Sequence, residues 1–224
     1  MKIKALVAAR SGSERVENKN LRQFAGKNLL EYKLESLLQI PSFDGVVLNS
    51  NCEEMLALAK SMGCETVRRD EEFATSSVSM NVCYHNMAEN FPGDIVVYCN
   101  ATSPMISTES IETAVRLYFE NQDLYTSVNS AHLIKEFMWM NGQALNYNPT
   151  LQPRSQDLPD IYSLNFAVSV ISREDMIKER SVVSSRCKLF TIPTVEAVDI
   201  DTLLDFEIAE YLFSKKISKI AENY

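Results

Sequence analysis

The sequence predicts an α/β fold in which a mostly parallel β-sheet lies between two layers of helices, giving three layers in all. Short apolar segments alternate with helical patterns along most of the chain, as in folds built from strand, helix and strand units. The segment at residues 94–99 (DIVVYC) is apolar on both faces, which is typical of a buried parallel strand. Because 46% of the 224 residues are apolar, the chain can form a folded core, and we expect a single domain over residues 1–224.

Strands are expected where a short apolar run is followed by polar or turn-forming residues. The first run, IKALVAA at residues 3–9, leads into a polar loop, and the run at residues 46–48 ends at Asn49-Ser50-Asn51. In such sheets ligands bind at the carboxyl ends of the strands, so polar residues directly after these runs are the first functional candidates. The expected strands are residues 3–9, 46–48, 64–67, 94–99, 124–128, 164–171 and 189–192.

Helices are expected where apolar side chains recur every three to four residues. Leu30, Leu34 and Leu37 form such a stripe after Asn28, and the helix that follows residue 52 should end at Gly63. The expected helices begin near residue 28, cover residues 52–62, 76–90 and 108–121, and begin again near residue 203.

The pattern changes between residues 131 and 163, where aromatic residues and prolines stand among polar residues. This segment contains Trp139, the single tryptophan, together with Phe137 and Tyr147. It suits an excursion from the sheet, and exposed aromatic side chains of this kind favour a contact between two copies of the chain. The alternative is a long loop that packs on its own domain.

Composition excludes several classes of function. The 30 acidic residues outnumber the 22 Lys and Arg residues, for a net charge of -8, which disfavours binding to nucleic acid through a basic surface. No apolar run approaches the length of a membrane span, and charged residues come too early in MKIKALVAARSGSER for a signal peptide. We therefore expect a cytoplasmic protein that binds neither nucleic acid nor membrane.

Common cofactor and catalytic motifs are also missing. The five cysteines form no CxxC pair, and the sequence contains neither GxGxxG nor GxxxxGK[ST]. The two histidines, His85 and His132, are expected to be structural, so a histidine-rich metal site is excluded. A phosphate group would have to be bound by a different kind of loop.

The loop at residues 9–20 is the first segment with suitable chemistry. It directly follows the first expected strand and offers backbone N–H groups, small hydroxyls and three cations. Arg10 and Lys19 could screen the charge of a polyphosphate, while Ser11, Gly12 and Ser13 would let the backbone approach it closely. The alternative is a solvated surface loop.

A second candidate is the acidic segment at residues 199–205. In an extended chain Asp199 and Asp201 would present their carboxylates on one side, as Mg²⁺ prefers when it is shared with substrate phosphates. Thr202 and Asp205 instead fit a capping box at the start of the last helix. The cap would account for Asp205 and leaves the two earlier aspartates without a structural explanation.

Two further segments offer polar side chains for a ligand. Asn100 and Ser103 follow the buried strand at residues 94–99 and could hydrogen-bond a base or a sugar, although a turn ending at Pro104 explains them equally well. Arg154 could bind a carboxylate through two parallel hydrogen bonds, although a surface arginine is often only solvated.

Four motifs together resemble the sugar-acid cytidylyltransferases, in particular the CMP-sialic acid synthetase (acylneuraminate cytidylyltransferase) branch. Residues 5–32 are similar to the family's opening pattern AR-x-GS-K-x-(I/L)-P-x-KN followed by GKPLI. The motifs ATSP, QPR and DIDTLLDFEIAE resemble the family's LQPTSP, QPRQ and DIDTxxDxxxAE, in the same order along the whole chain. The resemblance implies a Rossmann-like α/β domain with a dimerisation extension.

The implied reaction is attack of the anomeric hydroxyl of a 2-keto-3-deoxy sugar acid on the α-phosphate of CTP, with Mg²⁺ present. The implied assembly is a homodimer. Position by position, the catalytic residues would be Arg10, Lys19 and Asp201. The metal would be bound by Asp199 and Asp201. The nucleotide would contact Ser11, Gly12, Ser13, Asn20, Arg69 and Ser79. The sugar acid would contact Asn100, Ser103, Arg154 and Asn165.

The chain departs from the family pattern at several positions. Glu14 replaces a lysine, and Asn18 replaces a glycine but can still adopt a left-handed conformation. Where the sialate branch reads (F/Y)RPNG, Ser163 replaces the arginine and Phe166 the glycine, so Phe166 would fill space left for substrate. The expected acceptor is sialic acid or a related nonulosonic acid such as legionaminate or pseudaminate, and these last changes count against N-acetylneuraminate specifically. The alternatives are a CMP-KDO synthetase and a nucleotide-binding homologue that has lost catalysis.

Overall fold

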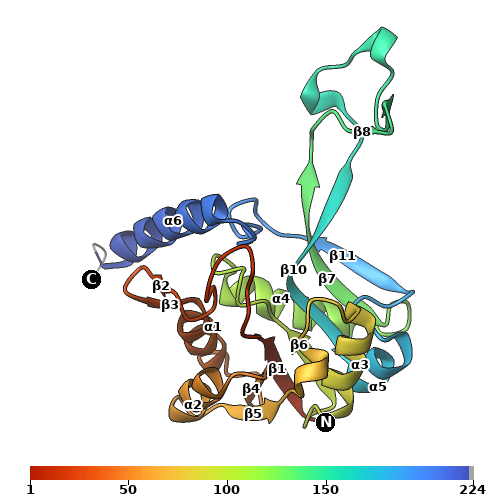
Figure 1. Ribbon diagram of the computed structural model, residues 1–224. Coiled ribbons are helices and arrows are strands. Elements are labelled where there is room, and N and C mark those ends of the chain that lie inside the picture. The colour runs from red at the N-terminus through yellow and green to blue at the C-terminus, as the bar shows by residue number, and fades with distance from the viewer. Residues whose placement is uncertain (222–224) are drawn as a thin grey trace.

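The computed structural model describes residues 1–221 and, within them, the side chains of residues 1–218. Seven strands form the central sheet in the order β11-β7-β10-β6-β1-β4-β5 (Figure 1). Only β10 runs antiparallel to its neighbours, β6 and β7, so the predicted mostly parallel sheet is confirmed. The strands are β1 (Ile3–Ala8), β4 (Val46–Ser50), β5 (Glu65–Arg68), β6 (Ile95–Tyr98), β7 (Ser127–Ile134), β10 (Ile161–Ser172) and β11 (Cys187–Thr191).

Five of the six α-helices pack on the two faces of this sheet through two hydrophobic clusters. One cluster joins α1, α2 and α4 to the sheet, and the other joins α3 and α5 to its opposite face. The helices are α1 (Leu29–Leu38), α2 (Glu53–Ser61), α3 (Met80–Glu89), α4 (Thr108–Glu120), α5 (Arg173–Glu179) and α6 (Leu203–Ala221). None of the helices in the described part of the chain has the length and apolarity needed to cross a bilayer.

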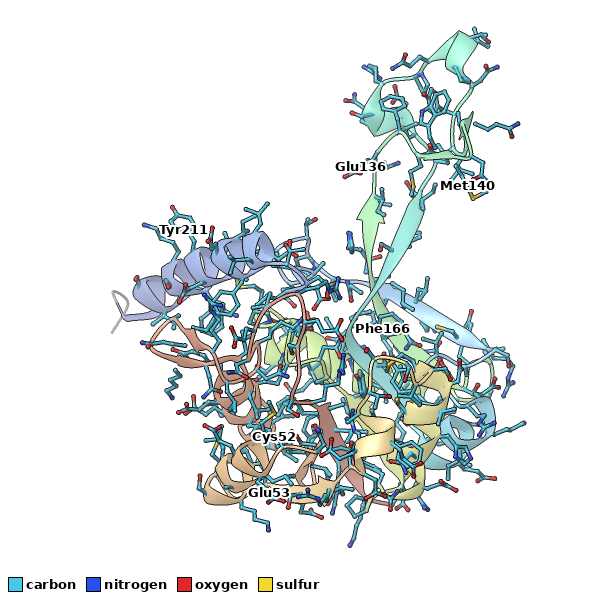
Figure 2. The ribbon with its side chains drawn as sticks, viewed as in Figure 1. Cys52, Glu53, Glu136, Met140, Phe166 and Tyr211 are labelled. Atoms are coloured by element: carbon cyan, nitrogen blue, oxygen red, sulfur yellow. The ribbon has the colours of Figure 1, made fainter. Side chains whose placement is uncertain are left out.

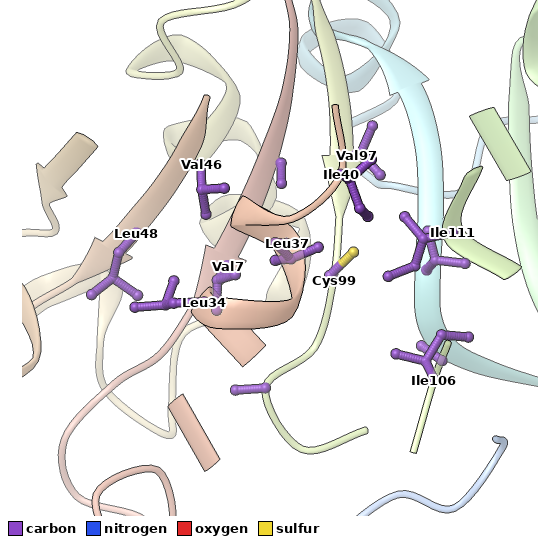
Figure 3. Packing of buried hydrophobic residues seen from close by; sticks show 14 of the residues in the cluster. Val7, Leu34, Leu37, Ile40, Val46, Leu48, Val97, Cys99, Ile106 and Ile111 are labelled. Atoms are coloured by element: carbon purple, nitrogen blue, oxygen red, sulfur yellow. The ribbon is translucent and has the colours of Figure 1, made fainter. Parts of the chain in front are cut away.

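The core follows from the alternation of side chains along the buried strands. In β1, Ala5 and Val7 pack with the α1 side of the sheet, whereas Leu6 packs with the α3 side. Leu34 and Leu37 of α1 lie over this part of the sheet and are fully buried (Figure 3). The apolar stripe read from the sequence is therefore the surface that attaches α1 to the sheet.

Local signals place several boundaries where they were expected. The Asn28 side chain accepts a hydrogen bond from the Glu31 backbone N–H at 2.8 Å, which caps α1. Gly63 has a φ of +85°, the left-handed conformation that ends a helix after its last turn. The capping residues read from the sequence were sufficient to place these two helix boundaries.

Other boundaries differ from the expectations. Helix α3 begins at Met80 rather than residue 76, because the preceding hydroxyl residues bond one another, as Thr75 and Ser77 do at 3.1 Å. Strand β7 begins at Ser127 rather than residue 124, because the backbone N–H of Leu124 is engaged in a turn closed on the Asn121 carbonyl. Helix α5 was not expected, since its seven residues fully bury only Met176 and leave no periodic stripe.

Strands β7 and β10 continue beyond the sheet as a long hairpin that projects away from the rest of the molecule (Figure 1). We call residues 135–160 the hairpin tip. It contains the short strands β8 (Trp139–Met140) and β9 (Gln143–Ala144), and several of its large apolar side chains are exposed, Trp139 by 55% and Met140 by 58%. The tip therefore does not pack on its own domain, and its predicted contact with a second copy stays a prediction.

Candidate active site

A cavity of about 430 Å³ lies where β1 and β6 end, between the loop at residues 9–20 and residues 100–102. These two strands are parallel neighbours, so their carboxyl ends meet at one edge of the sheet. The polar residues lining the cavity are Arg10, Ser13, Glu14, Arg15, Lys19, Asn20, Asn100 and Thr102. Five predicted site residues are among them: Arg10, Ser13, Lys19, Asn20 and Asn100.

Two residues with positive φ shape the loop at residues 9–20. Gly12 has a φ of +75°, and Asn18 has a φ of 51°, so the expected left-handed conformation of Asn18 is confirmed. The Asn18 carbonyl accepts hydrogen bonds from the backbone N–H groups of Leu21 and Arg22. An asparagine thus makes the turn for which the family pattern has glycine.

The cations of this loop are held in different ways. Lys19 donates from Nζ to the Ile200 carbonyl at 2.5 Å and lies 3.7 Å from the Asp201 carboxylate. Burial lowers the pKa of Lys19, against the opposing effect of the Asp201 charge. Arg10 donates from Nη1 to the Ala74 carbonyl at 2.7 Å, so its side chain extends toward the segment that precedes α3.

The two predicted metal ligands both contact residues that line the cavity. Asp199 accepts a hydrogen bond from Thr102 Oγ1 at 2.5 Å, and the neighbouring Ile200 N–H donates to the Thr102 carbonyl at 2.9 Å. Burial raises the pKa of Asp199, and the nearby charge of Asp201 raises it further. Asp201 Oδ1 lies 2.7 Å from Arg15 Nη2.

The capping box predicted at the start of α6 is confirmed. Asp205 accepts hydrogen bonds from the Thr202 N–H and Oγ1 at 2.7 and 2.8 Å, and the Asp205 N–H donates back to Thr202 Oγ1 at 3.3 Å. These hydrogen bonds to Thr202 lower the pKa of Asp205. The cap uses the Asp205 carboxylate and leaves those of Asp199 and Asp201 available for another role.

The chemistry of this carboxylate pair fits a divalent cation. A cation would relieve the mutual repulsion that helps to raise the pKa of Asp199. Within the described residues no three His, Cys, Asp or Glu side chains form a metal-binding group, so further ligands would have to be phosphate oxygens and water. Mg²⁺ is bound in this way by one or two carboxylates together with substrate phosphates.

The remaining nucleotide candidates lie around the cavity but do not line it. Arg69 is buried and donates from Nε to Asn49 Oδ1 at 2.6 Å, and burial lowers its pKa. The Ser11 hydroxyl accepts from Asn51 Nδ2 at 2.9 Å. Ser79 is exposed at the N-cap of α3 and makes no side-chain capping hydrogen bond.

The sugar-acid candidates fall into two groups. Ser103 is buried with its hydroxyl 3.4 Å from Asp199, and Asn165 lies where the pairing of β7 and β10 shifts register. Asn165 Oδ1 accepts from Ser130 Oγ at 2.6 Å, while its Nδ2 is buried without a partner. Arg154 instead lies in the hairpin tip, paired with Asp157 at 2.7 Å, away from the cavity of its own chain.

Phe166 lies at the base of the hairpin, far from Met140 in the tip (Figure 2). Its φ of 54° is the left-handed conformation that favours glycine, the residue of the family pattern at this position. The side chain packs against the hydrophobic cluster on the α3 side of the sheet.

Comparison with known proteins agrees with this geometry. The sequence matches the cytidylyltransferase family over residues 4–222. The chain belongs to this family. It is 28% identical to the pseudaminic acid cytidylyltransferase of Campylobacter jejuni, over 95% of this chain and 97% of that one, and 26% identical to the CMP-N,N'-diacetyllegionaminic acid synthase of Legionella pneumophila, over 95% and 96%.

The solved structures agree on the fold. A CMP:2-keto-3-deoxy-manno-octonic acid synthetase, solved in complex with CTP, superposes with a TM-score of 0.70 at 16% identity, covering 96% of this chain and all of that one. The predicted α/β fold and the resemblance to the sugar-acid cytidylyltransferases are therefore confirmed, and the protein is a nucleotidyltransferase.

Several residues of the site in this cytidylyltransferase were not assigned from the sequence. Thr102 fixes Asp199, Asn49 fixes Arg69, Asn51 fixes Ser11, and Arg15 contacts Asp201. Asn49 and Asn51 could have been found, because Asn49 lies near the carboxyl end of β4 and Asn51 directly follows it, and β4 is a parallel neighbour of β1.

Lys33 of this cytidylyltransferase gives a testable dependence of stability on pH. It is 3% exposed and donates to the Ser103 carbonyl at 2.9 Å, and burial lowers its pKa from 10.5 to about 8. Between pH 8 and 10.5 the unfolded chain binds this proton and the folded chain does not, so Lys33 makes stability rise with pH across that window. We expect the wild type to gain about 3 kcal/mol over this range relative to Lys33→Met.

Urea unfolding of wild type and Lys33→Met at pH 7.5 and pH 10.5 measures this effect. Lys60→Met, which replaces an exposed lysine of α2, is the control and should show the wild-type dependence on pH. If the free energies of unfolding of wild type and Lys33→Met changed equally with pH, that would contradict a lowered pKa for Lys33.

Proposed function

We propose that this protein transfers CMP from CTP to the anomeric hydroxyl of a nonulosonic, sialic-type sugar acid and releases pyrophosphate. The observation that carries the proposal is the cavity at the carboxyl edge of the sheet, which Arg10, Arg15 and Lys19 line and where Arg15 and Lys19 lie beside the Asp201 carboxylate. This arrangement suits a metal-bound triphosphate. The curated relatives, whose names specify transfer to pseudaminic and legionaminic acids, support the class of acceptor.

In the proposed reaction the anomeric oxygen bonds to the α-phosphorus and releases its proton to water. The bond from this phosphorus to the bridging oxygen breaks, and its electron pair leaves with pyrophosphate. Arg10 and Lys19 would neutralise the triphosphate and the departing pyrophosphate. Asp199 and Asp201 would hold Mg²⁺, which supplies charge neutralisation for the phosphates when it is bound. No covalent intermediate on a side chain is needed.

On the acceptor side, the polar groups of the structure fit a sugar acid. Asn100 lines the cavity, and Asn165 Nδ2 is a buried donor without a protein partner. A ligand oxygen would satisfy this donor, which is otherwise costly to bury. With Ser163 and Phe166 in place of an arginine and a glycine, the proposed acceptor is a legionaminate-type or pseudaminate-type acid in preference to N-acetylneuraminate.

The fourth acceptor residue, Arg154, requires a second copy of the chain. The tip holds Arg154 away from its own cavity and exposes Trp139, Met140 and Leu151. In a homodimer the tip of one protomer would bury these side chains against the other and bring Arg154 to the partner's cavity. We therefore propose a dimer with two composite acceptor sites, in which residues 131–163 form the dimerisation excursion of a single domain.

The test is release of pyrophosphate from CTP and Mg²⁺ with a panel of 2-keto-3-deoxy sugar acids. We expect the highest kcat/KM with pseudaminate or legionaminate, lower values with N-acetylneuraminate, and no release with any acid when UTP replaces CTP. The highest value with 3-deoxy-manno-octulosonate would instead favour the CMP-KDO synthetase alternative. No release with any acid, despite measurable CTP binding, would mean a nucleotide-binding homologue without catalysis.

A further inference from the structure

The buried face of α1 contains one lysine that folding does not explain. Lys33 is 3% exposed, and the other buried residues of this helix are all leucines. Its ammonium donates to a neutral acceptor, the Ser103 carbonyl oxygen, at 2.9 Å. Burial lowers the pKa of Lys33, so the charged form is disfavoured at this position. A leucine or methionine would suit the fold at least as well, and the reason for a lysine has to be sought in the segment that it holds.

That segment, residues 100–103, joins Lys33 to the proposed metal site. It directly follows β6 and turns back on itself, with the Ser103 N–H donating to the Asn100 carbonyl at 3.3 Å. The hydroxyls of Thr102 and Ser103 lie 2.5 and 3.4 Å from the same atom, Asp199 Oδ1. The backbone that Lys33 holds therefore carries the two hydroxyls that contact Asp199.

Loss of the Lys33 contact would reach the carboxylate through this segment. Ser103 is 1% exposed, so without Lys33 its carbonyl oxygen would be buried without that donor, which is costly. The segment would have to move to reach another donor or water. Displacements of about 1 Å at a binding site are enough to impair it, so the position of Asp199 depends on a residue of α1.

We propose that Lys33 is a positioning residue for the metal. By holding the Ser103 carbonyl, it keeps residues 100–103 in the position from which Thr102 and Ser103 orient the Asp199 carboxylate that we assign to Mg²⁺. This inference rests on the proposed function. Lys33 acts through Ser103 and takes no part in the transfer of CMP.

The sign of the effect separates positioning from simple electrostatics. Against the larger effect of burial, the Asp199 charge raises the pKa of Lys33, so the two charged groups are close enough to interact. Removing a positive charge near Asp199 would, by electrostatics alone, strengthen the binding of a metal cation. Weaker metal binding after loss of Lys33 is the result that positioning requires.

Lys4 offers a matched control. It is also a buried lysine, 6% exposed, and its ammonium donates to the two carboxylate oxygens of Glu65 at 2.6 and 2.8 Å. It lies near the amino end of β1, whereas the cavity lies where this strand ends. Lys4→Met therefore removes the same kind of group from the core without disturbing residues 100–103.

The experiment is titration of wild type, Lys33→Met and Lys4→Met with Mn²⁺ in the presence of CTP and without a sugar acid. Mn²⁺ suits the same oxygen ligands as Mg²⁺, and electron paramagnetic resonance measures its free ion, with CTP alone as the blank. We expect Lys33→Met to raise the Kd for Mn²⁺ about 10-fold, as loss of one charge-assisted hydrogen bond would, and Lys4→Met to stay within about 2-fold. Thermal unfolding checks that each variant folds.

Pyrophosphate release gives a second readout that a merely structural role would not move. In Lys33→Met the Mg²⁺ concentration for half the maximal rate should rise about 10-fold, while kcat at saturating Mg²⁺ stays within about 2-fold of wild type. Lys33→Arg keeps a cationic donor and should keep the Kd for Mn²⁺ within about 3-fold. A cavity of about 430 Å³ that Lys33 lines between α1 and α6 leaves room for the longer side chain.

A double variant tests the route through residues 100–103. Thr102→Val removes the 2.5 Å hydrogen bond to Asp199 and should weaken Mn²⁺ binding by itself. Adding Lys33→Met should then raise the Kd less than about 2-fold further, because both changes act on the same contact. If the two losses multiply in full, Lys33 does not act through this segment.

The outcomes are distinguishable from those of the proposed function. A wild type that binds no Mn²⁺ with CTP and releases no pyrophosphate contradicts the proposed function and this inference with it. With an active wild type, an unchanged or lower Kd in Lys33→Met contradicts the role of Lys33 alone. An equal loss in Lys4→Met, or a loss in Lys33→Arg as large as in Lys33→Met, also contradicts it.

Discussion

Replacing Asp201 by asparagine is expected to lower the rate of CMP transfer about a thousandfold while leaving the fold intact, since a metal contributes several kcal/mol to stabilising charge in the transition state. The Asp201 side chain is 50% exposed and contacts only Arg15 and Lys19 among the ion pairs of the described residues. Its backbone N–H is bonded to Asp205, which the substitution leaves in place. An amide binds Mg²⁺ far less well than a carboxylate because it carries no negative charge.

Pyrophosphate release measured across a range of Mg²⁺ concentrations tests this prediction. Asp205→Asn, in the same turn, is the control: it weakens the capping box and should lower the melting temperature while changing the rate only a few-fold. Full activity of Asp201→Asn at low Mg²⁺ would remove Asp201 from the metal site. A melting temperature that falls as far as the rate would instead assign the residue to the fold.

Much of this fold could be predicted because its signals are local. The stripe of Leu30, Leu34 and Leu37 and the cap at Asn28 define α1 without reference to any other element. The direction of β10 could not be predicted in this way. Nothing within residues 161–172 encodes an antiparallel strand, because the direction is set by the hairpin tip, which returns the chain beside β7.

The candidate site likewise has residues that could be placed from the sequence and contacts that could not. Arg10, Lys19 and Asn100 could be placed near one another because the carboxyl ends of parallel strands share an edge. The contact of Arg15 with Asp201, across 186 positions of the sequence, depends on how two loops meet in three dimensions. Lys33 looks like any surface lysine of a helix until the loop that carries Ser103 is seen to cover it.

Mixing two impaired variants is expected to restore activity if the hairpin tip acts across a dimer. Arg154→Ala should raise the KM for the sugar acid at least about 10-fold, because a bidentate contact with its carboxylate is lost. Asp201→Asn should be inactive through its own cavity. In a mixed dimer, the Arg154→Ala protomer supplies an intact cavity and the Asp201→Asn protomer supplies an intact tip, so one of the two sites is complete.

Random exchange of subunits between equal amounts of the two variants predicts recovery of about a quarter of the wild-type rate at low concentrations of acceptor. The double substitution Trp139→Asp with Met140→Asp, placed in both variants, is the control, because it puts charge on the exposed apolar surface of the tip. It should yield monomers by light scattering and abolish the recovery.

A wild-type protein that is monomeric and fully active at assay concentrations would contradict the composite site. A dimer in which Arg154→Ala keeps the wild-type KM would contradict the role of Arg154 while retaining the interface. The first result tests the interface between two copies, and the second tests the role of Arg154 in binding the sugar acid. The exposed Trp139 and Met140 favour a partner through hydrophobic burial alone, whereas a role for Arg154 in acceptor binding depends on that partner's cavity receiving it.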